Sequence, residues 1–239
     1  IEIVRNLVKK IYLNCDVILA QSKSFVKNIK NYKSLKSKQI LYFPVWSELN
    51  YDSRLIKKYP AIKTKKVFTI LFAGNIGKAQ DFESVIKAIK LLSKKVKDFR
   101  LVIVGEGSKK EWLIKATKQN KLEKIIEIYK KIPLEKMPSI FAHADALLVT
   151  LSDQIAFNMT IPGKVQTYLS TGIPIVGMLN GEGASTINES GAGFACDAGD
   201  YKGLAELIIK MKNTDKKTRI KMGQLGRIYS EKEFNKKVL

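Results

Sequence analysis

Residues 67–92, VFTILFAGNIGKAQDFESVIKAIKLL, decide the fold class of this 239-residue chain. A β-rich apolar run, Val67 to Phe72, leads into a turn that contains two glycines. Apolar residues then recur at helical spacing from Phe82 to Leu92. A strand followed by a helix is the unit from which parallel sheets are built. The segment therefore predicts an α/β domain.

The same alternation of strands and helices continues to residue 220. It predicts a Rossmann-like, doubly wound parallel sheet over residues 67–220, followed by a C-terminal helix over residues 221–239. The further strands are expected at Arg100–Val104, Ile125–Ile128, Ala146–Thr150, Ile173–Met178 and Gly193–Cys196, and a further helix at Tyr201–Met211.

The first 66 residues follow a different pattern. We expect a helix at Ile3–Tyr12, a strand at Val17–Ala20, a helix after Ser22 and a strand at Gln39–Phe43. Two strands do not make a stable sheet in isolation, so we interpret residues 1–43 as the end of an α/β domain whose beginning is absent. Residues 44–66 are rich in lysine and lack periodicity, which is typical of an interdomain linker.

The composition limits the classes of partner. The net charge is +21, but only five of the 43 basic residues are arginine, the residue that phosphate and base recognition favours. Scattered lysines indicate compositional bias, and we expect no nucleic-acid partner; attraction to an anionic membrane surface remains an alternative. No run approaches the roughly 20 apolar residues of a membrane span, and the start lacks a signal sequence. We expect a cytoplasmic protein, with peripheral contact at the inner face of the membrane left open.

Isolated polar and aromatic residues do not group into a catalytic or metal site. The only histidine, His143, is interpreted as a helix-end residue without a chemical role. Asp81 and Asp153 form no dyad, and the cysteines, Cys15 and Cys196, have no partner for a disulfide or a zinc site. The tryptophans, Trp46 and Trp112, are interpreted as packing residues.

Glycine-bearing turns follow several of the predicted strands, where an open parallel sheet binds its ligands. They are Gly74 to Gly77, Gly105 to Ser108 and Asn180 to Ala184. Glycines allow close approach to a phosphate, and a helix start supplies free N–H groups, although an ordinary turn explains any single one of these loops equally well. Lys164 follows Pro162 at a predicted helix start and places a cation near the same edge.

Four blocks, Ile70–Gln80, Val102–Gly107, Pro162–Pro174 and Gly181–Gly183, together resemble family 4 glycosyltransferases, which have the GT-B fold. The resemblance runs from about Asp16 to the C-terminus and is nearest to bacterial members that build O-antigen or capsule, including fucosamine transferases. It implies a nucleotide-sugar-binding C-terminal domain preceded by the end of an acceptor domain.

In that family an arginine and a lysine near the first glycine loop hold the donor diphosphate, and two glutamates eight residues apart contact the sugar and the ribose. Here Asn75 and Gln80 stand at the cation positions, and Met159 and Thr167 at the glutamate positions. Lys164 becomes the candidate cation. We expect it to act with backbone groups, and the full set of predicted donor-binding residues is Gly74, Asn75, Gly77, Gln80, Gly105, Tyr129, Lys164, Thr167, Gly181, Glu182, Gly183 and Ala184.

The resemblance implies transfer of a hexosyl group, with retention, from a nucleotide-diphosphate sugar to a lipid-linked or saccharide acceptor in bacterial surface polysaccharide synthesis. We expect UDP as the nucleotide, no metal cofactor, catalytic residues that this sequence does not identify, and no transfer by this piece alone because acceptor-domain residues are missing. Two alternatives remain: a GT-B nucleotide-sugar 2-epimerase, and a non-catalytic subunit that binds the donor for a partner.

Overall fold

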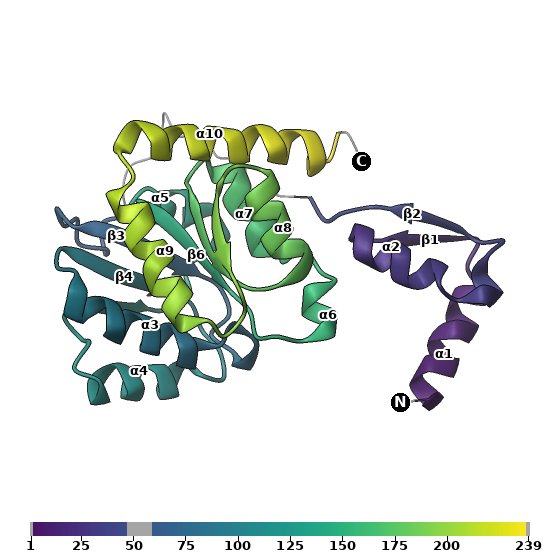
Figure 1. Cartoon of the computed structure of the whole chain (residues 1–239), viewed down its shortest axis with the longest axis horizontal. Helices are drawn as coiled ribbons and strands as arrows, with labels where there is room; N and C mark the ends of the chain where they lie inside the picture. The colour runs from purple at the N-terminus through teal and green to yellow at the C-terminus, as the bar shows by residue number, and fades with distance from the viewer. Residues whose placement is uncertain (1, 47–58, 238–239) are drawn as a thin grey trace.

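The computed structural model describes residues 2–46 and 59–237, and a six-stranded parallel sheet forms its centre (Figure 1). The strand order is β5-β4-β3-β6-β7-β8, so the chain reverses its progression across the sheet between β3 and β6. This order confirms the predicted doubly wound fold, in which a crevice opens beyond the carboxyl ends of the strands at the reversal. The strands are β3 (Phe68–Ala73), β4 (Phe99–Val104), β5 (Ile126–Tyr129), β6 (Ala146–Thr150), β7 (Ile175–Met178) and β8 (Gly193–Cys196).

Helices cover both faces of the sheet because its central strands bury side chains on both sides. In β3, Ile70 and Phe72 enter one core while Leu71 and Ala73 enter the other. This arrangement explains why β3 is a continuous apolar run and not an alternating one. The first core is closed by α3 (Phe82–Lys95), α4 (Lys110–Gln119) and α9 (Tyr201–Asn213), and the second by α5 (Met137–Phe141), α7 (Gly163–Thr171), α8 (Gly181–Glu189) and α10 (Lys216–Glu233).

Short elements complete the domain between these helices. They are a 3-10 turn at Lys78–Gln80, a 3-10 turn at Leu134–Lys136, and the one-turn helix α6 (Ile155–Asn158). Aspartates cap several long helices: Asp81 accepts the Ser84 N–H at the start of α3, and Asp215 accepts the Thr218 N–H at the start of α10. Asp81 is therefore explained by helix capping.

The C-terminal helix differs from its predicted bounds. It begins at Lys216 and ends at Glu233, whereas we expected it over residues 221–239. Asp215 supplies the start signal, and α10 then packs across α7, where Gly223 lies close to the Gly172 carbonyl group. Residues 216–220 thus belong to this helix and not to the preceding part of the domain.

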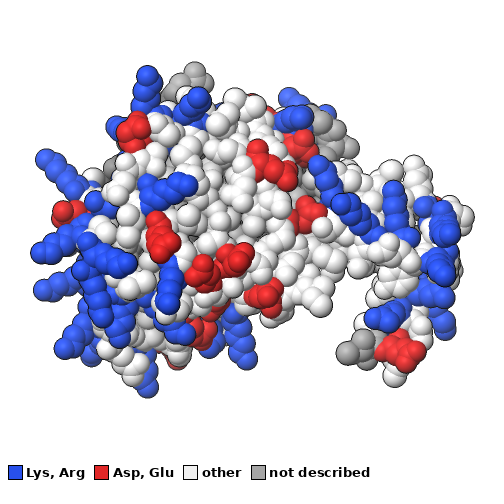
Figure 2. All heavy atoms as spheres, in the orientation of Figure 1, with Lys and Arg blue, Asp and Glu red and all other residues white. Residues whose placement is uncertain are grey.

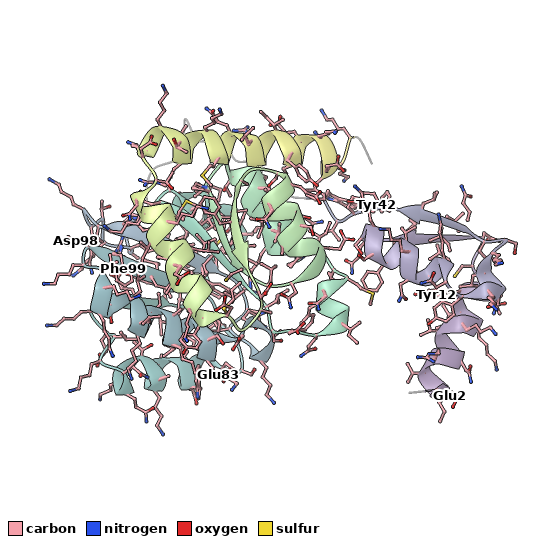
Figure 3. The ribbon with its side chains drawn as sticks, in the orientation of Figure 1. Glu2, Tyr12, Tyr42, Glu83, Asp98 and Phe99 are labelled. Carbon is pink, nitrogen blue, oxygen red and sulfur yellow. The ribbon has the colours of Figure 1, made fainter. Side chains whose placement is uncertain are left out.

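The N-terminal segment forms a small separate layer beside the main sheet (Figure 1). It contains α1 (Glu2–Leu13), β1 (Val17–Ala20), α2 (Lys23–Lys30), a 3-10 turn at Lys33–Leu35 and β2 (Gln39–Tyr42). The two strands lie where they were predicted, pair in parallel and share a small core with α2. Tyr42, at the end of β2, lies toward the main domain, while Tyr12 lies at the end of α1 that packs on the small core and Glu2 at its distal end (Figure 3).

The predicted linker is partly packed. Residues 47–58 lie outside the described residues, but Ile62 is buried in the second core and the Lys65 ammonium pairs with the Glu127 carboxylate at 2.7 Å. Residues 59–66 are therefore attached to the main domain. Within the described ranges, 2–46 and 59–237, no helix is long and apolar enough to cross a membrane.

Candidate functional site

A cavity of about 570 Å³ opens at the carboxyl ends of β3, β4 and β5. The turns after these strands form one side, and α5 and α7 form the other. Its lining combines glycines, apolar side chains and a few charged groups, which is the composition of a small-molecule site. The lining residues are Ala73, Gly74, Asn75, Val104, Gly105, Glu106, Gly107, Lys131, Ile132, Leu134, Met137, Phe141, Gly163, Lys164, Thr167 and Tyr168.

Two glycines bring the cavity walls together. Gly74 has a φ of 139°, and a Cβ at this position would lie 2.4 Å from Lys164 Cε. A Cβ on Gly105 would lie 1.9 Å from the Gly74 carbonyl oxygen. Side chains at either position are thus excluded by close approach. The contact of these turns with a phosphate stays a prediction, and the structure shows only their close approach to Lys164 and to each other.

Lys164 lies in the first turn of α7 with its ammonium group inside the domain. Its Nζ is 4.1 Å from the centre of the Phe72 ring and lies beside Gly74. No carboxylate of the described residues pairs with it, and burial lowers the pKa of Lys164 to about 8. Buried charges in proteins are normally paired, so this ammonium has the environment of a group that could pair with an anion.

Tyr168 fixes the position of α7 over β3. Its buried hydroxyl group accepts the Ala73 N–H at 2.8 Å and donates to the Ala73 carbonyl oxygen at 3.2 Å. Lys164 is four residues earlier on the same helix face. The clamp therefore holds the lysine ammonium against the turn that follows β3. Sequence reasoning did not identify Tyr168, although a tyrosine one helical turn after the candidate cation was visible in the sequence.

The two polar residues of the first glycine loop take different positions. Asn75 is exposed and lines the cavity, with its side chain close to Gly77 and Gly107. Gln80 is buried, and its Oε1 accepts the Gly77 N–H at 3.0 Å. Gly77 and Gln80 were expected to meet a diphosphate, but the structure bonds them to each other and places both outside the cavity lining.

Tyr129 also differs from its expected position. Its hydroxyl group donates to Glu127 Oε2 at 2.8 Å, and its pKa is raised to about 12 by burial and then by this bond. Its side chain is not part of the cavity lining, which Lys131 and Ile132 supply just after β5. Lys131 and Ile132, and not the predicted Tyr129, therefore border this cavity.

Glu106 joins the turns after β4 and β5 at the mouth of the cavity. Its Oε1 accepts a hydrogen bond from Lys110 Nζ at 2.5 Å, and the Lys131 N–H also donates to the carboxylate. The pKa of Glu106 is lowered, chiefly by the bond from Lys110. Glu106 is thus ionised and paired with Lys110, and in the described residues it forms no ion pair with the Lys164 ammonium.

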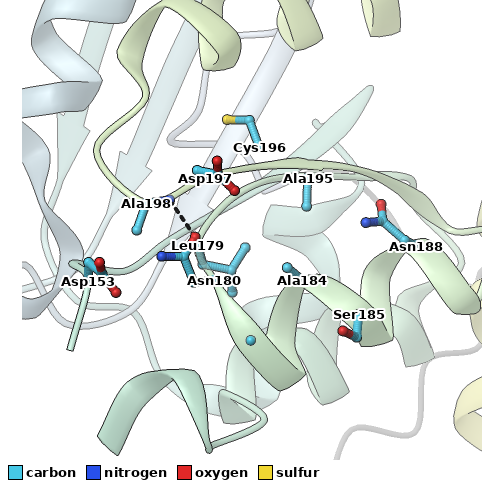
Figure 4. A pocket seen from close by; sticks show the side chains of 11 residues that line it. Asp153, Leu179, Asn180, Ala184, Ser185, Asn188, Ala195, Cys196, Asp197 and Ala198 are labelled. Atoms are coloured by element: carbon cyan, nitrogen blue, oxygen red, sulfur yellow. Dashed lines mark hydrogen bonds between the residues drawn. The ribbon is translucent and has the colours of Figure 1, made fainter. Parts of the chain in front are cut away.

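The glycine-bearing segment after β7 does not line the Lys164 cavity. Residues Gly181 to Ala184 are the first turn of α8, and Gly181 and Ala184 line a second cavity at the ends of β7 and β8 (Figure 4). The Glu182 carboxylate accepts the Ser24 N–H at 2.7 Å, and a Cβ on Gly183 would lie 2.6 Å from Leu179. None of the four lines the cavity that contains Lys164, so their expected shared contact with one diphosphate is not seen.

The two positions at which the family has glutamates, Met159 and Thr167, also lie in different parts of the domain. Thr167 lines the Lys164 cavity, whereas Met159 follows α6 and its carbonyl oxygen accepts a hydrogen bond from the Ser22 hydroxyl group. That bond and the contact between Glu182 and Ser24 attach the N-terminal segment to the main domain. Neither contact was predictable from the sequence, because more than a hundred residues separate the partners.

The other candidate residues of the sequence are the histidine, the two tryptophans and the two cysteines. His143 is buried, with Nε2 3.0 Å from the Tyr59 carbonyl oxygen, and lies outside both cavities. Trp112 packs on the first core with Lys109 over its ring, and Trp46 lies edge-on to Phe43. Both cysteines are free. Cys196 lines the second cavity, where burial raises the pKa of its thiol to about 12.

Comparison with known proteins identifies the family and supports the fold. The family model described as glycosyl transferases group 1 matches residues 53–228. The probable glycosyltransferase WbjE of Pseudomonas aeruginosa is 29% identical over 154 residues, covering 62% of this chain and 36% of that protein. The putative colanic acid biosynthesis glycosyl transferase WcaI of Escherichia coli strain K12 is 26% identical over 168 residues, covering 66% of this chain and 39% of that protein.

The chain thus spans less than two fifths of the length of these two curated relatives. Among solved structures, Anabaena HepE in complex with UDP and glucose superposes with a TM-score of 0.75. The match covers 97% of this chain and 62% of that chain at 14% sequence identity. At this identity the likeness establishes the shared fold.

Proposed function

This chain belongs to the group 1 glycosyl transferases and has the GT-B type of α/β domain, and from this premise we propose that it binds the nucleotide-diphosphate sugar donor of a glycosyl transfer reaction. We propose UDP as the nucleotide and a lipid-linked or saccharide acceptor in bacterial surface polysaccharide synthesis. The names of WbjE and WcaI, and the UDP bound to HepE, support this choice of reaction and donor.

Lys164 is the observation that carries the proposal. Its ammonium is buried beside Gly74 without a carboxylate partner in the described residues. A diphosphate would supply the missing negative charge and would regain part of the energy lost when the lysine was removed from water. The cavity beside it is roomy enough, at about 570 Å³, to take a nucleoside.

The walls of this cavity suit the two ends of a nucleotide. The apolar part of the lining, Ile132, Leu134, Met137 and Phe141, comes from the segment after β5 and from α5. A base is a flat ring that gains from apolar contact on its faces. Lys164 and Gly74 lie at the other part, so we place the base between the turn after β5 and α5, and the phosphates against the start of α7.

The chemistry that this arrangement supports is departure of a diphosphate. When the bond between the sugar carbon and the phosphate oxygen breaks, the electron pair stays with the diphosphate. The negative charge on the diphosphate therefore increases. A fixed cation and aimed N–H groups stabilise that charge more in the transition state than in the bound donor. We propose that Lys164 fills this role without a metal ion, and that transfer proceeds with retention of configuration.

The acceptor side is proposed to come from the rest of a longer protein. On the N-terminal segment, α1 exposes Ile3, Val4 and Leu7, and the β1–β2 sheet exposes Leu19 and Leu41. Large apolar side chains gathered on one small layer are typical of a surface that another part of a protein covers. The chain alone is therefore expected to bind donor without catalysing transfer.

A non-catalytic donor-binding subunit is the second candidate function. Met159 and Thr167, which carry no charge, stand where the family has its two glutamates, and this favours a protein that holds the donor for a partner. The epimerase alternative requires an acid and a base at the sugar, and the carboxylate that lines the Lys164 cavity, Glu106, is already paired with Lys110. Hydrolysis or transfer of donor by the complete protein distinguishes enzyme from subunit.

Binding of nucleotides to this chain tests the donor proposal. We expect UDP to raise the melting temperature, because a ligand that binds only the folded state stabilises it by about 2.7 kcal/mol at a concentration of 100 times Kd. UMP should give a smaller shift and uridine the smallest, since only UDP carries the diphosphate. Equal shifts from UDP and UMP, or none at saturating concentration, would remove Lys164 from the phosphate site.

A further inference from the structure

Two lysines line the cavity that we assign to the nucleotide, and they differ in burial. The ammonium of Lys164 is buried, whereas Lys131 is exposed. We propose that Lys164 is a site of acylation by a small acyl phosphate, whose phosphate group pairs with Lys131 while the acyl group is transferred. The reaction requires only this chain and the reagent. Its consequence, weaker donor binding, rests on the proposed function, because acylation removes the charge of the lysine.

Lys164 Nζ borders the open space of the cavity. Gly74 lies against it, and a Cβ at residue 74 would be 3.1 Å from Nζ. A side chain at this position would crowd the nitrogen, so the glycine keeps access to it open. The centre of the Phe72 ring lies 4.1 Å from Nζ. The cavity, at about 570 Å³, has room for a reagent of a few atoms and for the acyl group that it leaves on the lysine.

The environment of Lys164 favours the uncharged amine. The other charged groups that line the cavity are Glu106 and Lys131, and Glu106 is paired with Lys110. Removal from water destabilises the ammonium form, and burial lowers the pKa of Lys164 to about 8. A lysine that is desolvated in this way acts as a nucleophile at neutral pH. Lys164 therefore combines access from a cavity with an amine that is partly free.

The reactivity expected of Lys164 follows from two opposing effects. At pH 7 a pKa of about 8 leaves about one tenth of this lysine as free amine, against roughly one part in 2,500 for an ordinary lysine of pKa ~10.4. A weaker base is also a weaker nucleophile, by about tenfold here if the Brønsted slope of about 0.4 to 0.5 known for thiols is used. We therefore expect acylation about twentyfold faster than at an exposed lysine.

Lys131 determines which class of reagent the cavity favours. Only the uncharged amine of Lys164 reacts, so the charge that holds an anionic reagent must come from a second cation. Lys131 follows β5 and supplies an exposed ammonium to the same lining. An acyl phosphate joins an electrophilic carbonyl carbon to a phosphate group, which an ammonium binds by charge-assisted hydrogen bonds. The cavity thus offers a cation for the phosphate and an amine for the carbonyl carbon.

The reaction transfers one acyl group and one proton. The lone pair of Lys164 Nζ attacks the carbonyl carbon, and an N–C bond forms. The C–O bond to the phosphate breaks, and its electron pair leaves with the phosphate. The nitrogen loses one proton, which the phosphate takes up as hydrogen phosphate. The product is a neutral amide, which avoids the cost of a buried charge.

Site-resolved mass spectrometry of the full chain incubated with acetyl phosphate tests the inference. Figure 2 shows basic side chains extending from much of the surface, and the exposed Lys78 and Lys115 serve as internal standards. At pH 7 we expect Lys164 to be acetylated about twentyfold faster than these standards. Its rate should level off above about pH 8, whereas the rate at an ordinary exposed lysine rises toward pH 10.

Lys131→Met separates recognition of the phosphate from simple reactivity. With acetyl phosphate, this variant should acetylate Lys164 about tenfold more slowly than the wild type, because one charge-assisted contact is lost. With the acetyl ester of N-hydroxysuccinimide, which has no phosphate group, the rate should equal that of the wild type. Lys130→Met is the matched control, because Lys130 is exposed, adjacent in sequence and outside the cavity lining. Thermal unfolding shows whether both variants are folded.

Two further readouts separate this inference from the proposed function. Saturating UDP should protect Lys164 from acetylation and leave the rates at Lys78 and Lys115 unchanged. The chain acetylated at Lys164 should bind UDP about ten- to hundredfold more weakly, as should Lys164→Gln, which imitates the neutral amide. Rapid acetylation of Lys164 without protection by UDP would support the acylation site and contradict the donor function.

The inference is overturned if Lys164 in the wild type is acetylated no faster than Lys78 and Lys115 at pH 7. A rate at Lys164 that continues to rise to pH 10 would also overturn it, because the amine would then be an ordinary one. Equal effects of Lys131→Met on the two reagents would show that Lys131 does not hold the phosphate, and would contradict the assignment to acyl phosphates.

Discussion

Replacing Lys164 with methionine should stabilise the ligand-free protein. The shift of the Lys164 pKa from 10.5 to about 8 corresponds to about 3 kcal/mol, at 1.36 kcal/mol per pH unit. Burial is the cause, and the contact with the Phe72 ring at 4.1 Å offsets about 1 kcal/mol of it. Methionine keeps most of the aliphatic chain and has no charge. We therefore expect a gain of about 2 kcal/mol at pH 7, or roughly 4 to 8 °C in melting temperature.

The sign of this effect depends on pH in a defined way. The folded-state pKa of Lys164 is lower than its unfolded-state value, so the folded protein binds the proton less tightly. The ammonium is charged in both states below about pH 8, and its destabilising effect is fully present there. As the pH rises from about 8 toward 10.5, the wild type gains stability from this group. The advantage of Lys164→Met should become smaller over the same interval.

The same substitution should weaken UDP binding. A charge-assisted contact contributes roughly 1.5 to 3 kcal/mol, so loss of the ammonium is expected to lower UDP affinity about ten- to hundredfold. Unfolding in urea and titration calorimetry measure the two effects on the same protein. Lys78→Met is the control, because Lys78 is exposed and lies outside the cavity lining.

Lys164 does not meet the diphosphate if Lys164→Met leaves UDP affinity unchanged or if Lys78→Met weakens it as much. A variant that is less stable than the wild type at pH 7 would also contradict the account, because it would mean that the ammonium has a favourable protein partner. Opposite changes in stability and affinity are the distinctive expectation, since a general packing defect would lower both.

Three further predictions concern the scaffold and the charge. Tyr168→Phe should lower the free energy of unfolding by about 2 kcal/mol, because it leaves the Ala73 N–H and carbonyl group without the tyrosine hydroxyl; urea unfolding measures this. Burial raises the pKa of Glu127, but hydrogen bonds and charges from Lys65, Tyr129 and Arg100 lower it overall. The stability of the wild type should therefore fall more than that of Glu127→Gln as the pH drops below about 4.5. Urea unfolding midpoints at several pH values measure this difference. Binding to mixed-sequence DNA should be weak and lost near physiological salt, as a fluorescence titration would show.

The strands of the sheet were predictable because each is a short apolar run with glycines or polar residues after it. Their ends shifted by one or two residues for local reasons. β3 continues to Ala73, which pairs with Val104 and is clamped by Tyr168, and β7 begins at Ile175 because Pro174 precedes it. The helix α3 runs past Leu92 to Lys95 because no helix-breaking residue follows Leu92 within that turn.

The candidate site was less predictable, because its contacts join residues that are distant in the sequence. The structure brings Gly74, Gly105 and Lys164 together, as the edge of a doubly wound sheet requires. It does not bring Glu182 to them, because that carboxylate bonds to the Ser24 N–H, 158 residues away. Even a local contact was missed at Gly77, whose N–H was expected to be free for a ligand. The side chain of Gln80, three residues later, accepts a hydrogen bond from it.

Proton uptake on UDP binding tests the central claim, that Lys164 meets the diphosphate, most directly. With a pKa of about 8 in the free protein, Lys164 is about one quarter protonated at pH 8.5, and pairing with a diphosphate raises its pKa. Titration calorimetry in buffers of different ionisation enthalpy should then show uptake of about 0.7 proton per UDP by the wild type and none by Lys164→Met. Equal uptake by the two proteins, or none by the wild type, would contradict the account.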